Sequence, residues 1–170
     1  MNPSRYVVVM GVSGCGKSTV AALLAGRLGW AFIEGDSVHP PANVEKMSRG
    51  IPLTDADRGP WLQEIATTVR NWREDGVAGV IACSALRRNY REIISAGAGD
   101  LSFAYLRGSF SLIEQRLAAR QGHYMPVSLL ESQFATLEEP QQDEPVITLD
   151  ISTSAESMVA DIIKSLKLSP

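Results

Sequence analysis

"GVSGCGKS", residues 11–18, follows a short run of valines and precedes a stretch with helical spacing. It matches the pattern G-x-x-x-x-G-K-[ST], in which backbone N–H groups and a helix N-terminus face a polyphosphate. Gly11, Gly14 and Gly16 permit the tight turn. Lys17 supplies positive charge to the outer phosphates, and the Ser18 hydroxyl is placed to ligate Mg²⁺. The stretch therefore predicts a phosphate-binding loop between a strand and a helix, with ATP and Mg²⁺ as cofactors.

Three further residues of this loop belong to the predicted nucleotide site. Ser13 and Cys15 lie within the turn, and Thr19 follows in the first turn of the helix. Cys15 occupies a variable position of the pattern, so we expect its side chain to fill space rather than to react.

Outward from the loop, short apolar runs alternate with helical patterns along the whole chain. Strands are predicted at 6–10, at 30–33, at 79–86 including the strand's exit, at 101–108 and at 146–151. Helices are predicted at 17–28, in a stretch that holds Val44 and Met47, and at 61–75, 87–94, 111–120, 128–137 and after 153. Such alternation is typical of an α/β fold, a mostly parallel sheet with helices on both faces. We expect a single domain over residues 1–170.

Three helix starts carry a capping-box pattern, in which Ser or Thr precedes Glu by three residues. The pairs are Ser111 with Glu114, Ser128 with Glu131, and Thr153 with Glu156. They predict that these helices begin beside Ser111, Ser128 and Thr153.

Composition narrows the possible partners and location. The chain has 170 residues, 45% of them hydrophobic, and a net charge of −3, which gives no electrostatic argument for nucleic acid or anionic membranes. No apolar run approaches the ~20 residues that span a bilayer. The two cysteines, Cys15 and Cys83, have neither zinc-like nor redox spacing. We expect a cytoplasmic protein that acts on small molecules.

Other classes of protein that contain a phosphate-binding loop fit the sequence less well. GTPase switches need an Asp-x-x-Gly segment and an Asn/Thr-Lys-x-Asp base reader, and the sequence has neither. AAA-type ATPases usually place an acid at the end of an inner strand, but residues 82–84 are Ala-Cys-Ser. A kinase with a small acceptor is therefore favoured.

Acidic residues instead follow the second predicted strand, in "FIEGDSVHP", residues 32–40. Carboxyl ends of neighbouring parallel strands face the same crevice, so Glu34 and Asp36 are expected near the transferred phosphate. Asp36 is the predicted catalytic base, although it could instead cap a turn before proline. Glu34 is predicted to hold Mg²⁺ through a water molecule. His39 is predicted to contact the substrate, with a structural histidine as the alternative.

Several longer segments carry a resemblance to a known family. The loop together with "GDSVHPPANVEKMSRGIPLTDADRGPWL", "CSALRRNYR", "RLAARQGHYMP" and "SQFATLEEP" closely resembles the gluconokinases of the small, thermoresistant bacterial type. The resemblance implies five parallel strands in the order 2-3-1-4-5, forming a three-layer sandwich with a lid at about 121–138. It also implies transfer of the ATP γ-phosphate to the 6-hydroxyl of D-gluconate, and a homodimer.

The sequence departs from this family at one position. Gluconokinases read Asp-Gly-Asp where this chain has Glu34–Gly35–Asp36. The charge is unchanged, but the glutamate side chain is longer than that of aspartate. This changes where the Glu34 carboxylate can lie relative to Mg²⁺.

An anionic polyol needs a cation for its carboxylate and polar partners for its hydroxyls. Arg58 and Arg87 are the predicted cations, because arginine offers a bidentate fork. Ser84 could hydrogen-bond the substrate or cap a helix, and Arg58 could be a solvated helix-start charge. Arg88 and Arg91 are predicted at the surface.

The segment after residue 111 is predicted to serve the phosphates. Arg116 and Arg120 are four residues apart and share one helical face. By resemblance, Arg116 contacts the adenine base and Arg120 the transferred phosphate, where Arg120 would act with Lys17 and Asp36 in catalysis. His123, in the lid, is a predicted substrate contact. An ordinary basic helix end is the alternative for the two arginines.

The sequence therefore predicts an ATP-dependent kinase, with gluconate as the acceptor. Another small kinase of this fold, acting on shikimate or a nucleoside monophosphate, is the alternative enzyme. A non-catalytic ATP-binding regulator is the alternative of a different class.

Overall fold

The computed structural model describes residues 4–96, 98–119 and 127–170. Its strands pair in parallel in the order β2-β3-β1-β4-β5, which confirms the predicted sheet. They are β1 Tyr6–Met10, β2 Ala31–Glu34, β3 Gly79–Ala82, β4 Leu101–Arg107 and β5 Val146–Asp150. The helices are α1 Lys17–Leu28, α2 Pro41–Ser48, α3 Asp55–Asp75, α4 Arg88–Ser95, α5 Phe110–Ala118, α6 Val127–Thr136 and α7 Ala155–Leu166.

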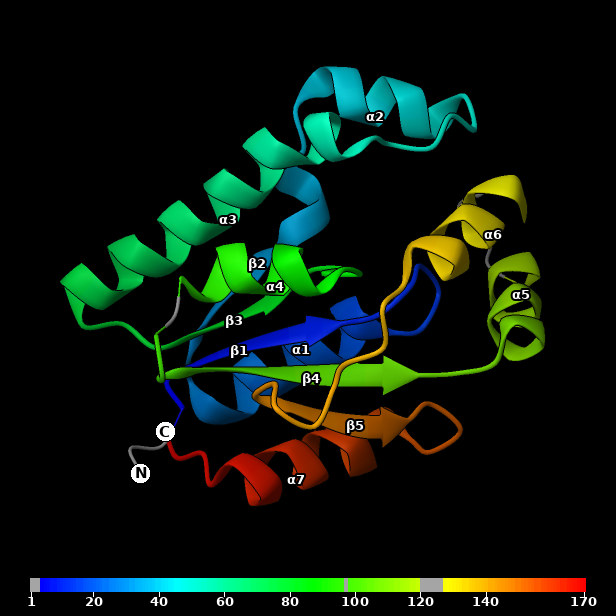
Figure 1. Cartoon of the computed structure of the whole chain (residues 1–170). Coiled ribbons are helices and arrows are strands. Elements are labelled where there is room, and N and C mark those ends of the chain that lie inside the picture. Colours follow the sequence, from blue (N-terminus) through cyan, green and yellow to red (C-terminus); the bar gives the residue numbers. More distant parts are fainter. Residues whose placement is uncertain (1–3, 97, 120–126) are drawn as a thin grey trace.

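The sheet is the middle of three layers (Figure 1). Successive strand residues point to opposite faces, so each buried strand contributes to two cores. Val7 and Val9 pack with α1 and α7, whereas Val8 and Met10 pack with α3 and α4. Helices α5 and α6 follow the carboxyl end of β4, beside the phosphate-binding loop.

The long helix α3 contributes Arg58 and Trp61 to the lining of a cavity next to the phosphate-binding loop. It begins at a capping box in which the Thr54 hydroxyl accepts from the Asp57 N–H and the Asp57 carboxylate accepts from the Thr54 N–H. Asp57 also binds the Lys46 ammonium at 2.9 Å, which attaches α2 to the start of α3. The residue that caps α3 therefore also links it to α2. No helix of the described residues is long and apolar enough to cross a membrane.

The predicted capping boxes at the later helices were wrong by one or two residues. Ser109, not Ser111, caps α5 by accepting from the Leu112 N–H, and Ser154, not Thr153, caps α7. The Thr153 hydroxyl instead donates to the Asp150 carbonyl. Ser128 lies inside α6, which begins at Val127. Neighbouring hydroxyls compete for the same role, and backbone direction decides between them.

Candidate active site

The phosphate-binding loop has the backbone geometry that the glycine pattern predicts. Gly11 and Gly14 have φ of 146° and 84°, in a region that residues with a side chain rarely adopt. A Cβ at Gly14 would lie 2.8 Å from Leu117 Cγ, so α5 packs directly on the loop. Cys15 is fully buried beneath it, and burial raises the pKa of its thiol, which agrees with a space-filling role.

Lys17 lies at the floor of the site with 5% of its surface exposed. Burial alone would lower the pKa of its ammonium, but the carboxylate of Asp36 and, more weakly, that of Glu34 raise it overall. Lys17 therefore stays charged, as a phosphate ligand must be.

Ser18 and Glu34 lie together at the ends of neighbouring elements. The Ser18 hydroxyl donates to Glu34 Oε2, and Glu34 Oε1 is buried with no hydrogen-bond partner among the described residues. A buried carboxylate oxygen without a partner is costly unless a ligand completes it. A hydroxyl and a carboxylate are the oxygen ligands that Mg²⁺ prefers, so this pair fits the ion.

Asp36 lies on a short 3₁₀ helix, Gly35–Val38, directly after β2. The Trp61 indole N–H donates to the Gly35 carbonyl at 2.8 Å and holds this turn against α3. Trp61 is itself buried. The turn therefore presents Asp36 from a rigid support.

This support predicts the effect of a side chain at Gly35. A Cβ there would overlap the Ala82 carbonyl oxygen and lie 3.1 Å from Cys83 Cβ, and backbone atoms cannot move aside. We expect Gly35→Ala to lower the free energy of unfolding by about 1–3 kcal/mol and to lower kcat by displacing Asp36. Urea unfolding and steady-state rates measure both effects. Gly26→Ala, in open space on α1, is the control and should not destabilise the protein.

One cavity of about 340 Å³ extends from the phosphate-binding loop to the start of α3. Ser13, Lys17 and Asp36 line the phosphate end. The other predicted residues that line it are His39, Arg58 and Ser84. Arg87 is not among the described residues that line this cavity, and its Nε is buried without a hydrogen-bond partner there.

His39 stacks on Trp61, with ring centroids 4.1 Å apart. Burial lowers the pKa of His39, although Asp36 opposes this, so the imidazole is neutral at neutral pH. The Asn43 carboxamide lies 3.2 Å from His39 Nδ1 and can donate to it. That tautomer leaves Nε2–H as a donor.

Arg58 is fixed at the far wall, with 12% of its side chain exposed. It donates to the Tyr90 hydroxyl at 3.0 Å, and that hydroxyl donates to Asp55. The low exposure argues against a solvated helix-start charge. Tyr90 also lines the cavity and was not predicted, because aromatic residues at helical spacing ordinarily indicate core.

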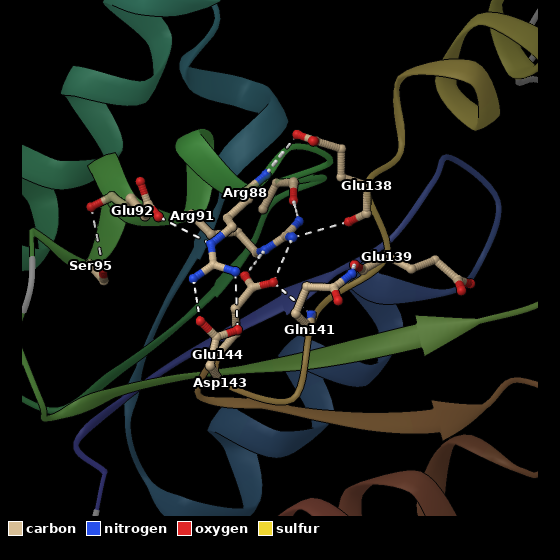
Figure 2. Close-up of polar contacts among 10 residues, drawn as sticks. Arg88, Arg91, Glu92, Ser95, Glu138, Glu139, Gln141, Asp143 and Glu144 are labelled. Atoms are coloured by element: carbon tan, nitrogen blue, oxygen red, sulfur yellow. Dashed lines mark hydrogen bonds and ion pairs between the residues drawn. The ribbon is translucent and has the colours of Figure 1, made fainter.

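The prediction that Arg91 lies at the surface was wrong. Figure 2 shows its polar contacts. Only 2% of its side chain is exposed, and Arg91 Nε lies 2.7 Å from Glu144 Oε1. Its guanidinium also donates to the carbonyls of Ala85 and Glu138, at 2.8 and 3.0 Å. Ala85 has φ of 46°, a conformation that costs energy for a residue with a side chain. Arg91 thus holds the turn after Ser84.

The remaining predicted residues lie elsewhere. Arg116 donates to the Ile151 carbonyl at 2.7 Å, after β5, and Thr19 is exposed on α1. Arg120 and His123 lie outside the described residues. Gln133, on α6, lines the cavity and hydrogen-bonds Ser13, yet was not singled out. In the sequence, the only indication of a role for Gln133 was its place in "SQFATLEEP", one of the segments that carry the family resemblance.

Comparison with known proteins agrees with this geometry. Residues 7–140 match a family model described as an AAA domain. A gluconokinase of Gluconobacter oxydans is 50% identical over 160 residues, covering 94% of this chain and 90% of the relative. The thermoresistant gluconokinase of Escherichia coli is 45% identical over 161 residues, covering 94% and 92%.

A solved gluconokinase from Sinorhizobium meliloti superposes with a TM-score of 0.87 at 42% identity, covering 97% of this chain and 92% of that chain. The AAA description agrees with the phosphate-binding loop, while β3 ends at Ala82 and is followed by Cys83 and Ser84, without the acid usual in AAA-type ATPases. The two curated relatives and the solved structure named above are gluconokinases. The chain belongs to the gluconokinase family of P-loop kinases.

Proposed function

We propose that this protein transfers the γ-phosphoryl group of ATP to the 6-hydroxyl of D-gluconate, giving 6-phospho-D-gluconate and ADP. The observation that carries the proposal is the single cavity that Lys17, Asp36 and Arg58 share. A phosphate ligand, a carboxylate base and a guanidinium for the acceptor carboxylate are the groups that this transfer needs.

The proposed parts of Lys17, Asp36, His39 and Arg58 follow from their places around the cavity, and those of the other residues follow from the family resemblance and the sequence. Lys17 and the loop N–H groups hold the phosphates, and Arg58 orients gluconate through its carboxylate. Asp36 accepts the proton of the attacking hydroxyl, and His39 Nε2–H donates to a second hydroxyl. Arg116 and Arg120 are proposed for the base and the transferred phosphate. Ser84, Arg87 and His123 are proposed as further acceptor contacts.

Mg²⁺ is part of the proposal. The ion would be held by Ser18 and Glu34, because the Glu34 oxygen that lacks a partner suits a water ligand of the metal. When bound, it neutralises charge on the phosphates. The longer arm of Glu34 is compatible with this, since its carboxylate reaches Ser18.

We also propose a single domain with a lid at about 121–138, a homodimer and a cytoplasmic location. The family resemblance supports the dimer, and two buried cysteines outside any disulfide suit a reducing compartment. Light scattering on the purified protein tests the dimer.

The first experiment is ADP release from Mg-ATP with D-gluconate, its epimers, shikimate, nucleoside monophosphates or no acceptor. Turnover that depends on gluconate is expected. Turnover with another acceptor alone would transfer the proposal to that substrate, and nucleotide binding without any acceptor-dependent turnover would favour a regulator.

A further inference from the structure

Gln133 connects helix α6 to the phosphate-binding loop by two hydrogen bonds. Its Oε1 accepts from the Ser13 N–H at 2.7 Å, and its Nε2 donates to the Ser13 hydroxyl at 3.0 Å. The two residues are 120 positions apart in the sequence. Because both ends of the carboxamide are engaged, the side chain has one defined orientation.

Helix α6 has other attachments as well, and one of them, Leu130, belongs to the same buried core as Val12 and Cys15 of the loop. Leu130 is buried in the core, and Phe134 packs edge-on against Phe110 of α5, with ring centroids 5.3 Å apart. Beyond the helix, the Glu138 N–H donates to the Leu86 carbonyl at 2.7 Å. These contacts fix the helix and its carboxyl end to the body of the protein. Gln133 adds the polar contact between this helix and the phosphate-binding loop.

Ser13 and Gln133 border the cavity in which phosphoryl transfer is proposed. Lys17 and Asp36 line the same space. The two Ser13–Gln133 hydrogen bonds therefore join the phosphate-binding loop to α6 at the edge of this cavity. Without these hydrogen bonds, α6 could move away from the loop, and water could enter the cavity beside the reacting phosphate.

We infer that Gln133 is a positioning residue that holds α6 on the loop, so that the acceptor hydroxyl rather than water reaches the γ-phosphorus. The inference rests on the proposed function and adds Gln133 to the residues that serve it. In the unwanted reaction, a water oxygen bonds to the γ-phosphorus, the bond to the β–γ bridging oxygen breaks, and ADP, inorganic phosphate and a proton result. Kinases suppress this reaction by closing the site.

The test uses Gln133→Met, which keeps side-chain length and helix propensity but removes both hydrogen bonds. The net contribution of one hydrogen bond corresponds to a factor of several in an equilibrium constant. Loss of two should therefore raise the ratio of phosphate release to phosphorylated gluconate by roughly tenfold. Hydrogen exchange at the Ser13 amide should also quicken. Glu131→Gln, exposed on the same helix, is the matched control and should change neither quantity.

Gln133→Glu separates positioning from general stability. A carboxylate can accept from both the Ser13 N–H and the Ser13 hydroxyl, so slow exchange and the wild-type ratio should be retained. Its charge faces the phosphates, so KM for ATP should rise.

Two results would overturn the inference: a Gln133→Met enzyme with the wild-type ratio, or one with unchanged exchange at Ser13. If the wild-type enzyme does not phosphorylate gluconate, the proposed function fails instead. The exchange measurement, made without acceptor, still decides whether Gln133 holds α6 on the loop.

Discussion

Asp36→Asn is expected to lower kcat by about 10²–10⁴-fold while leaving the Kd for Mg-ADP nearly unchanged. Asp36 lies on a turn held by Trp61 and lines the cavity beside Lys17. Asparagine occupies the same space but cannot accept a proton from the attacking hydroxyl. Steady-state rates with gluconate measure the first quantity, and titration calorimetry measures the second.

Asp161→Asn is the control for this change, because Asp161 is exposed on α7 and lies outside the cavity lining. It removes one carboxylate charge and should leave kcat unchanged. Full activity of Asp36→Asn would refute the assignment of Asp36 as the base. A large loss of nucleotide affinity would show instead that Asp36 acts by orienting Lys17.

Arg91→Ala is expected to lower the free energy of unfolding by about 3–5 kcal/mol, as measured by urea denaturation. The change leaves the Glu144 carboxylate, 7% exposed, without its cation. Burial raises the pKa of Glu144, but the hydrogen bonds from Arg91 and from the Gln141 backbone hold it below its usual value. The carbonyls of Ala85 and Glu138 lose a donor as well.

Arg88→Ala provides the comparison, since Arg88 binds Asp143 and Glu92 at the surface. Water replaces those contacts, so the loss should be much smaller than for Arg91→Ala. Arg91→Met combined with Glu144→Leu should recover part of the lost stability, because no charge is then left buried alone. Equal losses at Arg88 and Arg91 would contradict the structure in Figure 2.

Local sequence patterns predicted the elements well and the helix caps less well. Helix α1 begins at Lys17 and ends at Leu28, before a left-handed Gly29, as its spacing and the glycine indicated. The cap of α7 is Ser154 because Thr153 is engaged by the Asp150 carbonyl. Which of two adjacent hydroxyls meets a helix N–H depends on the path of the incoming chain, which the pattern does not contain.

Strand order and strand-end logic also predicted which residues would gather. The structure brings Lys17, Asp36, His39, Arg58 and Ser84 to one cavity. Lys17, Asp36 and Ser84 follow parallel strands that end at the same edge, whereas Arg58 comes from α3. Their roles stay predictions. Arg91 and Gln133 could not be assigned, since each acts through partners tens of residues away.

The sequence by itself determined the phosphate-binding loop, the alternation of strands and helices and the acids after the second strand, because glycine freedom and side-chain periodicity are local properties. Only the tertiary structure decided that Arg91 is buried and that Gln133 meets Ser13. An arginine or a glutamine in a helix has the same local preferences whether it faces water or the protein. Its environment is set by the element that packs against it, and therefore by contacts distant in sequence.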